Sequence, residues 1–98
     1  YVFAANGVGK IGLRNFDGSA VGGLLDIDGD TDAHISTLEG SDNKLKIAYT
    51  DVASTNDGTF RSCDLDGSNC GSKITYETGS ASSNNILEIN NRLFIRRR

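Results

Sequence analysis

The sequence predicts an all-β protein built from two four-stranded propeller-type blades and one additional C-terminal strand. The chain nearly repeats itself, because LRNFDGSAVGG at 13–23 returns as SCDLDGSNCGS at 62–72. Strand-like openings at Tyr1, Leu45 and Leu93 begin three successive units, 44 and then 48 residues apart. A period of about 40 to 50 residues made of short strands is typical of propeller blades, each of which buries its apolar face against its neighbours.

The composition favours short strands and tight turns over helices. The 98 residues include 12 Gly but no Pro, Met or Trp, and 37% of them are hydrophobic. Gly, Asn and Asp readily adopt the positive φ angles that tight hairpins need. No segment has a sustained helical stripe of apolar residues, so we expect almost no helix.

Alternating apolar residues and Gly-containing turns divide the chain into strands. In the first blade, residues 1–43, the expected strands are Tyr1–Asn6, Gly9–Asn15, Val21–Ile27 and His34–Leu38. In the second blade, residues 44–91, they are Leu45–Thr50, Thr59–Asp64, Lys73–Thr78 and Asn85–Ile89. A ninth strand, Arg92–Arg97, lies in 92–98 and begins a third repeat or closes a blade. Turns are expected at Asn6-Gly7, Asp17-Gly18, Asp28-Gly29, Asp57-Gly58 and Asp66-Gly67.

Two blades cannot close a ring, since propellers use about 4 to 8. Their exposed ends require either further blades of a parent chain or a homo-oligomer, in which identical chains associate head to tail around an axis. The alternative fold is a single β-sandwich of eight or nine strands, which fits the length but leaves the repeat unexplained.

The two cysteines, Cys63 and Cys70, flank the turn DLDGSN. Opposed positions on an antiparallel hairpin have a suitable separation for a disulfide, and such a bond indicates an extracellular or cell-surface protein. Free buried thiols are the alternative. The C-x6-C spacing does not match a redox pair, and two thiols with one distant histidine do not complete a zinc site.

The charge distribution argues against nucleic-acid and membrane partners. The net charge is -3 although three of the ten basic residues are the terminal Arg96, Arg97 and Arg98, so the rest of the chain is acidic. An acidic body offers no electrostatic footprint for nucleic acid. No stretch approaches the 18 or so apolar residues that span a bilayer, so we expect no membrane insertion.

The densest chemical cluster is DIDGDTD at 26–32. Counted from Asp28, its carboxylates follow the ligand order of an EF-hand calcium loop, except that Ala33 stands where the sharp turn needs Gly. Several aspartates in one turn favour a hard cation, so calcium is the predicted cofactor, and a solvated acidic turn is the alternative. The candidate ligands are Asp28, Asp30 and Asp32, followed by Asp26 and Glu39.

Three other side chains are candidate ligand-binding residues. Tyr49, Tyr76 and Arg61 can form a sugar-stacking or cation-π surface, although strand aromatics in a chain this poor in apolar residues also serve as core. The sole histidine, His34, has no identifiable nucleophile or orienting partner. We therefore expect the protein not to be an enzyme.

Short motifs resemble known propeller families. LKIAYTD followed by a DGS hairpin is similar to blades of sialidase-like and lectin-like propellers. ANGVGKI and TFRSCDLDG resemble segments of small two-bladed bacterial fucose-binding lectins, three chains of which form a six-bladed ring. Those lectins clamp sugar with Arg, Glu and Trp. This chain has Tyr1 or Lys46 near the first position, Leu13 or Ser62 near the second, and no Trp.

The resemblance implies a non-catalytic, extracellular, lectin-like module that binds a glycan. A second hypothesis is a scaffolding fragment of a larger repeat-containing surface or filament protein, since CDLDGSNC also resembles blades of prokaryotic surface proteins. A third reading, part of a glycosidase-type propeller enzyme, requires catalytic residues from other blades.

Overall fold

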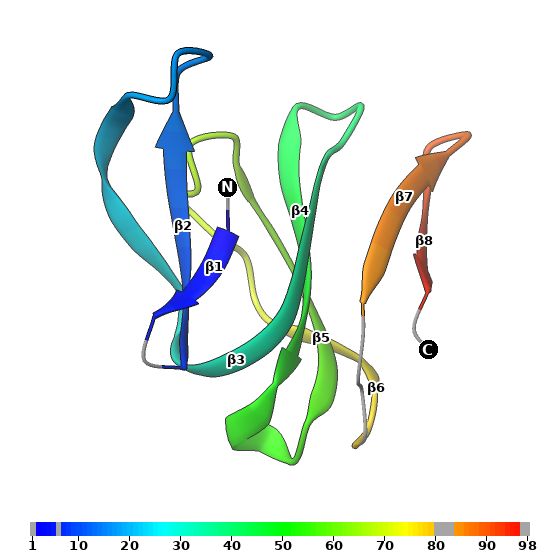
Figure 1. The fold of residues 1–98 in the computed structure, drawn as a ribbon. Helices are drawn as coiled ribbons and strands as arrows, with labels where there is room; N and C mark the ends of the chain where they lie inside the picture. Colours follow the sequence, from blue (N-terminus) through cyan, green and yellow to red (C-terminus); the bar gives the residue numbers. More distant parts are fainter. Residues whose placement is uncertain (1, 6, 80–83, 97–98) are drawn as a thin grey trace.

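The computed structural model describes residues 2–5, 7–79 and 84–96 (Figure 1). Its strands are all antiparallel, which confirms the predicted all-β class. One sheet contains, in chain order, Val2–Ala5 (β1), Val8–Arg14 (β2), Ala20–Glu39 (β3), Lys44–Asp51 (β4), Asp57–Asp64 (β5) and Ile74–Glu77 (β6). Asn85–Ile89 (β7) and Arg92–Arg96 (β8) form a separate hairpin. The described residues include a single 3₁₀ turn, Val52–Ser54 (η1), and their two sheets close neither a barrel nor a propeller ring.

The 20-residue strand β3 corrects one part of the prediction. Val21–Ile27 and His34–Leu38 were expected to be separate strands, but they belong to one continuous element. The φ angles of Gly29 (75°) and His34 (51°) are positive, and the β3–β4 register shifts between Ala33 and Ser36. The strand bends there instead of reversing, because its first half stays paired with β2 and its second half with β4.

The core lies between these two halves of the sheet. Ile11 of β2 and Ile27 of β3 pack with Ile47 and Tyr49 of β4 and Cys63 of β5, all nearly inaccessible to solvent. Since β3 belongs to both halves, its bend positions residues from the first repeat against strands of the second.

The repeated DGS motifs form matching hairpin turns. Gly18 N donates to Asn15 O at 2.9 Å, and Gly67 N donates to Asp64 O at 2.8 Å. The two glycines have φ angles of 90° and 87°. In each turn the aspartate Oδ1 also accepts a 2.9 Å hydrogen bond from the backbone amide of the serine two residues later. The sequence repeat is therefore also a repeat of backbone geometry.

The junction after each repeat pairs similar residues, although the second junction is one residue shorter than the first. Glu39 lies opposite Leu45 in the β3–β4 pair, and Glu88 lies opposite Leu93 in the β7–β8 pair. The β7–β8 hairpin stands beside β3 and β4 (Figure 1). It is anchored by Asn84, whose Nδ2 donates to the backbone carbonyl of His34 at 3.0 Å.

The predicted cysteine pair is also confirmed, because Cys63 and Cys70 are joined by a disulfide across the β5–β6 connection. Cys63 is fully buried. Within the described ranges, no helix has the length and apolar character needed to cross a membrane.

Candidate functional site

Three aspartates converge near the bend of β3. Asp28 and Asp32 are four residues apart on this extended strand and therefore can share a face. Asp51 ends β4 and lies directly opposite Asp32. One carboxylate oxygen from each residue lies within 4.8 Å of the other two, so these three residues form the acidic cluster.

The acidic cluster is almost completely inaccessible to solvent. Asp32 is 2% exposed and Asp51 is 1% exposed. Tyr49 donates its hydroxyl to Asp28 Oδ2 at 3.1 Å. Lys73 Nζ lies 2.7 Å from Asp51 Oδ2 and 3.4 Å from Asp28 Oδ2. Lys73 and Tyr49 therefore supply one cation and one hydroxyl donor to three carboxylates.

Several carboxylate oxygens remain without a donor. Both oxygens of Asp32 and Oδ1 of Asp51 are buried and have no hydrogen-bond partner. Burying a carboxylate without a donor or a cation is costly, and a protein usually avoids it by pairing the group or protonating it. The acidic cluster is thus short of positive charge.

The pKa values of the cluster reflect this shortage. Burial, followed by the neighbouring Asp28 and Asp51, raises the pKa of Asp32 to about 8. Burial and the charge of Asp28 also raise the pKa of the Tyr49 hydroxyl. In the opposite sense, the hydrogen bond to Asp51 raises the pKa of Lys73 and keeps its ammonium charged. With all three carboxylates ionised, the group including Lys73 has a net charge of -2.

The backbone of β2 encloses the acidic cluster on one side. A Cβ atom added to Gly9 would lie 2.7 Å from Asp32 Oδ2 and 3.0 Å from Ile27 Cδ1. Any larger residue would have to displace the carboxylate or the core side chain behind it. Gly9 therefore permits the close approach of β2 to Asp32.

The predicted calcium ligands have different positions. Asp28 and Asp32 meet in the acidic cluster, whereas Asp26 forms an ion pair with Lys10 at a partly exposed position. Glu39 is exposed at the opposite end of β3. The side chain of Asp30 lies outside the described residues.

Asp51 was not among the predicted metal ligands. Its place depends on the irregular register of β3, since Glu39 faces Leu45 and Ser36 faces Ala48, a spacing that would put Val52 opposite Asp32. The shift between Ala33 and Ser36 brings Asp51 there instead. No signal in the sequence identifies that one-residue shift. Regular pairing of the hairpin would nevertheless predict a partner for Asp32 only one residue away from Asp51.

The structure does not bring the three predicted sugar-binding residues together on one surface. Arg61 donates to the carbonyls of Ile27, Gly71 and Cys70 and thereby ties the β5–β6 connection to β3. Tyr49 is fully buried, and its hydroxyl donates a hydrogen bond to Asp28 of the acidic cluster. Tyr76 lies over β5, where its ring would be 2.7 Å from a Cβ added to Gly58.

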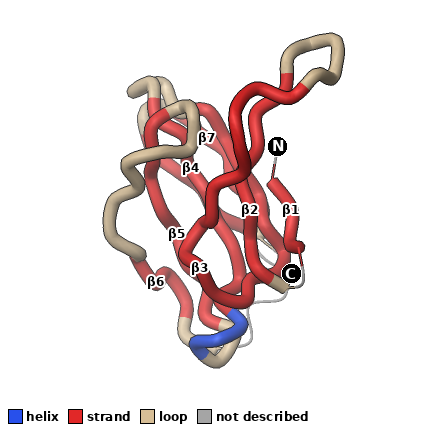
Figure 2. Tube along the Cα trace, turned by 90° about the vertical axis from the view of Figure 1, so that its left-hand side faces the viewer, coloured by secondary structure: helices blue, strands red, loops and turns tan. Residues whose placement is uncertain are grey.

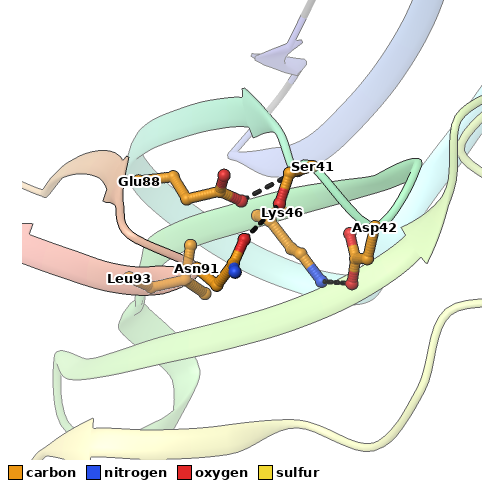
Figure 3. Close-up of a pocket in the computed structure, with 6 residues that line it drawn as sticks. All are labelled: Ser41, Asp42, Lys46, Glu88, Asn91 and Leu93. Atoms are coloured by element: carbon orange, nitrogen blue, oxygen red, sulfur yellow. Dashed lines mark hydrogen bonds and ion pairs between the residues drawn. The ribbon is translucent and has the colours of Figure 1, made fainter.

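A second candidate site is a polar pocket between the β3–β4 turn and the β7–β8 hairpin (Figure 3). Its volume is about 380 Å³. Ser41 N donates to Glu88 Oε1 at 2.8 Å, and Ser41 Oγ donates to Asn91 Oδ1 at 3.1 Å. On the other side, Lys46 Nζ lies 2.6 Å from Asp42 Oδ2. The residues that line this polar pocket are Ser41, Asp42, Lys46, Glu88, Asn91 and Leu93.

Comparison of the chain with protein-family models, curated proteins and solved structures finds no significant match. A functional assignment for this protein therefore depends on its two candidate sites.

Proposed function

We propose that this protein is a non-catalytic binding module that acts outside the cytoplasm and binds carbohydrate in the polar pocket. The observation that carries the proposal is the composition of that pocket, which combines charged and amide groups with the apolar side chain of Leu93. Binding sites for small ligands pair apolar contact area with a few fixed polar groups. Hydroxyl-rich ligands such as sugars can use both kinds of surface.

The hydrogen bonds around the polar pocket hold its polar groups in fixed positions. Ser41 orients Glu88 and Asn91, which come from the neighbouring hairpin. Lys46 is held by Asp42 and by Ser62 Oγ at 3.0 Å, so its ammonium has a fixed position. Polar groups that are oriented before binding lose less conformational entropy when a ligand arrives.

A glycan array followed by calorimetric titration of the best saccharide tests this proposal. Glu88→Gln should weaken binding at least roughly tenfold, because a charged hydrogen-bond acceptor is lost. Glu39→Gln is the matched control, since Glu39 holds the same position in the first repeat and does not line the pocket. Absence of any saccharide ligand, or equal binding by both variants, would contradict the proposal.

We also propose that the acidic cluster binds calcium. Three converging carboxylates supply the oxygen ligands that hard cations prefer, and a divalent ion would neutralise the net charge of -2 that the group carries once Asp32 is ionised. Calcium accepts bidentate carboxylates in irregular geometry, whereas magnesium usually retains several waters, for which this buried cluster is poorly suited. Asp28, Asp32 and Asp51 would be the ligands, and Asp32 and Asp51 contribute the buried oxygens that lack a donor.

Calcium should raise the melting temperature of the protein. At a free concentration a hundredfold above its Kd, binding stabilises the folded state by about 2.7 kcal/mol, which corresponds to a shift on the order of 10 °C for a domain of this size. Asp51→Asn should abolish the shift. Asp26→Asn should retain it, because Asp26 pairs with Lys10 away from the cluster. An unchanged melting curve of the unsubstituted protein in millimolar calcium would refute the metal site.

The extracellular location is supported by the disulfide between Cys63 and Cys70. Disulfides form and persist in oxidising compartments and are rare in the cytosol. The chain isolated from its native source under acidic, thiol-trapping conditions should therefore contain no alkylated cysteine, and two alkylated thiols would contradict this location.

A further inference from the structure

The turn of the second DGS hairpin packs on a strand pair of the first repeat. A Cβ added to Gly67 would lie 2.8 Å from Ile11 Cγ2 and 3.4 Å from Leu25 Cδ1. Ile11 and Leu25 face each other across β2 and β3. Asp66 also helps to line a groove of about 320 Å³ with residues 21–25. The second turn is therefore docked on the Ile11–Leu25 pair.

The repeat supplies a second copy of each half of this contact. Positions 49 residues after Ile11 and Leu25 are Phe60 and Ile74, which also face each other, across β5 and β6. The position 49 residues before Gly67 is Gly18. The Phe60–Ile74 pair is thus the equivalent of the Ile11–Leu25 pair, and the turn at Gly18 is the equivalent of the turn at Gly67.

Both equivalent surfaces are at least partly open to solvent in the described structure. Nothing lies within 4 Å of a Cβ added to Gly18, and Phe16 beside it is fully exposed. The corresponding Leu65 of the docked turn is 41% exposed. On the acceptor side, Ile74 is 57% exposed and Phe60 is half-buried. Figure 2 shows the tip of the β2–β3 hairpin extending away from the body of the molecule.

We propose that the first DGS turn of one chain docks on the Phe60–Ile74 pair of a second copy of the same chain. This contact would reproduce between molecules the one that Gly67 makes with Ile11 and Leu25 within the molecule. The donor turn and the acceptor pair are different surfaces, so the contact is heterologous, and it can repeat into a ring or a filament.

The charges at the equivalent positions are also compatible with a second copy as the occupant. In the contact within the chain, Asp66 lines the groove with Leu24. Their equivalents, 49 residues away, are Asp17 and Lys73. Docking would place the Asp17 carboxylate of one chain beside the Lys73 side chain of the next, which is 40% exposed although its ammonium already pairs with Asp51 and Asp28. The proposed contact is independent of whether the polar pocket binds a saccharide.

Sedimentation measurements from micromolar to millimolar concentration test the proposal. The unsubstituted protein should associate, and a finite mass would indicate a ring, whereas a mass that grows with concentration would indicate a filament. Phe16→Asp and Ile74→Asp should each weaken association at least roughly tenfold, since each places a charge in an apolar contact. Both side chains are exposed, so circular dichroism should show an unchanged β-sheet spectrum.

A mixture of the two variants tests whether the turn of one chain binds the apolar pair of another. Phe16→Asp retains the acceptor pair and Ile74→Asp retains the turn, so an equimolar mixture should form a one-to-one heterodimer although neither variant associates alone. Ile89→Asp is the control, because Ile89 is 50% exposed on the other hairpin, and it should associate normally. A monomeric unsubstituted protein, a mixture that stays monomeric, or loss of association only in Ile89→Asp would each overturn the proposal.

Discussion

The two DGS hairpins have the same backbone but opposite surroundings. Their turn hydrogen bonds agree within 0.1 Å, from 2.8 to 2.9 Å, and both glycines are left-handed. Yet Gly67 is buried against the first repeat, whereas no described atom outside its neighbours lies within 4 Å of a Cβ placed on Gly18. The comparison shows that the local sequence determines the turn, while the position of the repeat in the chain determines whether the turn is packed.

The connection between the third and fourth strands of each repeat differs more strongly. In the first repeat it is the bend of β3, which carries Asp28 and Asp32 into the core. In the second repeat, β6 ends at Glu77 and β7 begins at Asn85. The corresponding sequence, ETGSASS at 77–83, has one acid where residues 28–34 of the first repeat have three. Only the first connection therefore contributes buried charge among the described residues.

The largest expected effect comes from this buried charge. In metal-free protein, the free energy of unfolding should fall as the pH rises from about 4 to about 8, because folded Asp32 keeps its proton up to its pKa of about 8 whereas the unfolded residue loses it near 4. The decline should be on the order of a few kcal/mol. Urea unfolding at several pH values in a chelator measures it.

Asp32→Asn provides the control for this pH dependence. The substitution resembles the protonated carboxyl, so the variant should lose most of the decline between pH 4 and 8. A flat profile for the unsubstituted protein would contradict the raised pKa of Asp32. Calcium should reverse the trend, since ligand carboxylates must be ionised and binding strengthens as the pH rises.

The next largest effect is expected from alanine substitutions of the two turn glycines, which distinguish backbone strain in the turn from packing against the first repeat. Gly18→Ala should destabilise the protein by roughly 1 to 2 kcal/mol through its positive φ alone. Gly67→Ala has the same strain and also drives a Cβ to 2.8 Å from Ile11, so its loss should be roughly 2 to 4 kcal/mol. Chemical denaturation of both variants measures the difference. Equal losses would show that the second turn is not docked on the first repeat.

A smaller effect is expected from the disulfide, which is present in only one of the two hairpins. Reduction of Cys63–Cys70 should lower the free energy of unfolding by about 2 kcal/mol, because the closed loop is short. Amide exchange should accelerate at Gly67 and remain unchanged at Gly18. Similar acceleration at both amides would mean that the bond stabilises the whole fold instead of its own hairpin.

Much of the fold could be predicted from the sequence because its signals are local. The Asp-Gly-Ser turns, the alternating strands and the cysteine pair depend on neighbouring residues, and the structure contains them. The break expected at Asp28-Gly29 is wrong, because a glycine with positive φ can bend a strand as well as reverse it, and the choice depends on its partners in β2 and β4.

The acidic cluster could be predicted only in part, because some of its residues are distant from one another in the sequence. Asp28 and Asp32 stand out as neighbours in the sequence, whereas Asp51 arrives through the pairing of β4 with β3 and Lys73 arrives on the β5–β6 connection. The burial that raises the pKa of Asp32 also depends on the packing of β2, through Gly9. The calcium and glycan ligands remain predictions for the experiments above.

The β3–β4 and β7–β8 junctions pair the same two residue types, which has a consequence for how such a gene can change. Glu39 lies opposite Leu45 and Glu88 lies opposite Leu93, although the second junction is one residue shorter. Recombination between the two coding segments upstream of these glutamates would insert or delete one repeat and carry each junction over intact. Alleles that differ in length by about one repeat would therefore encode proteins that keep the Glu–Leu pair at the junction.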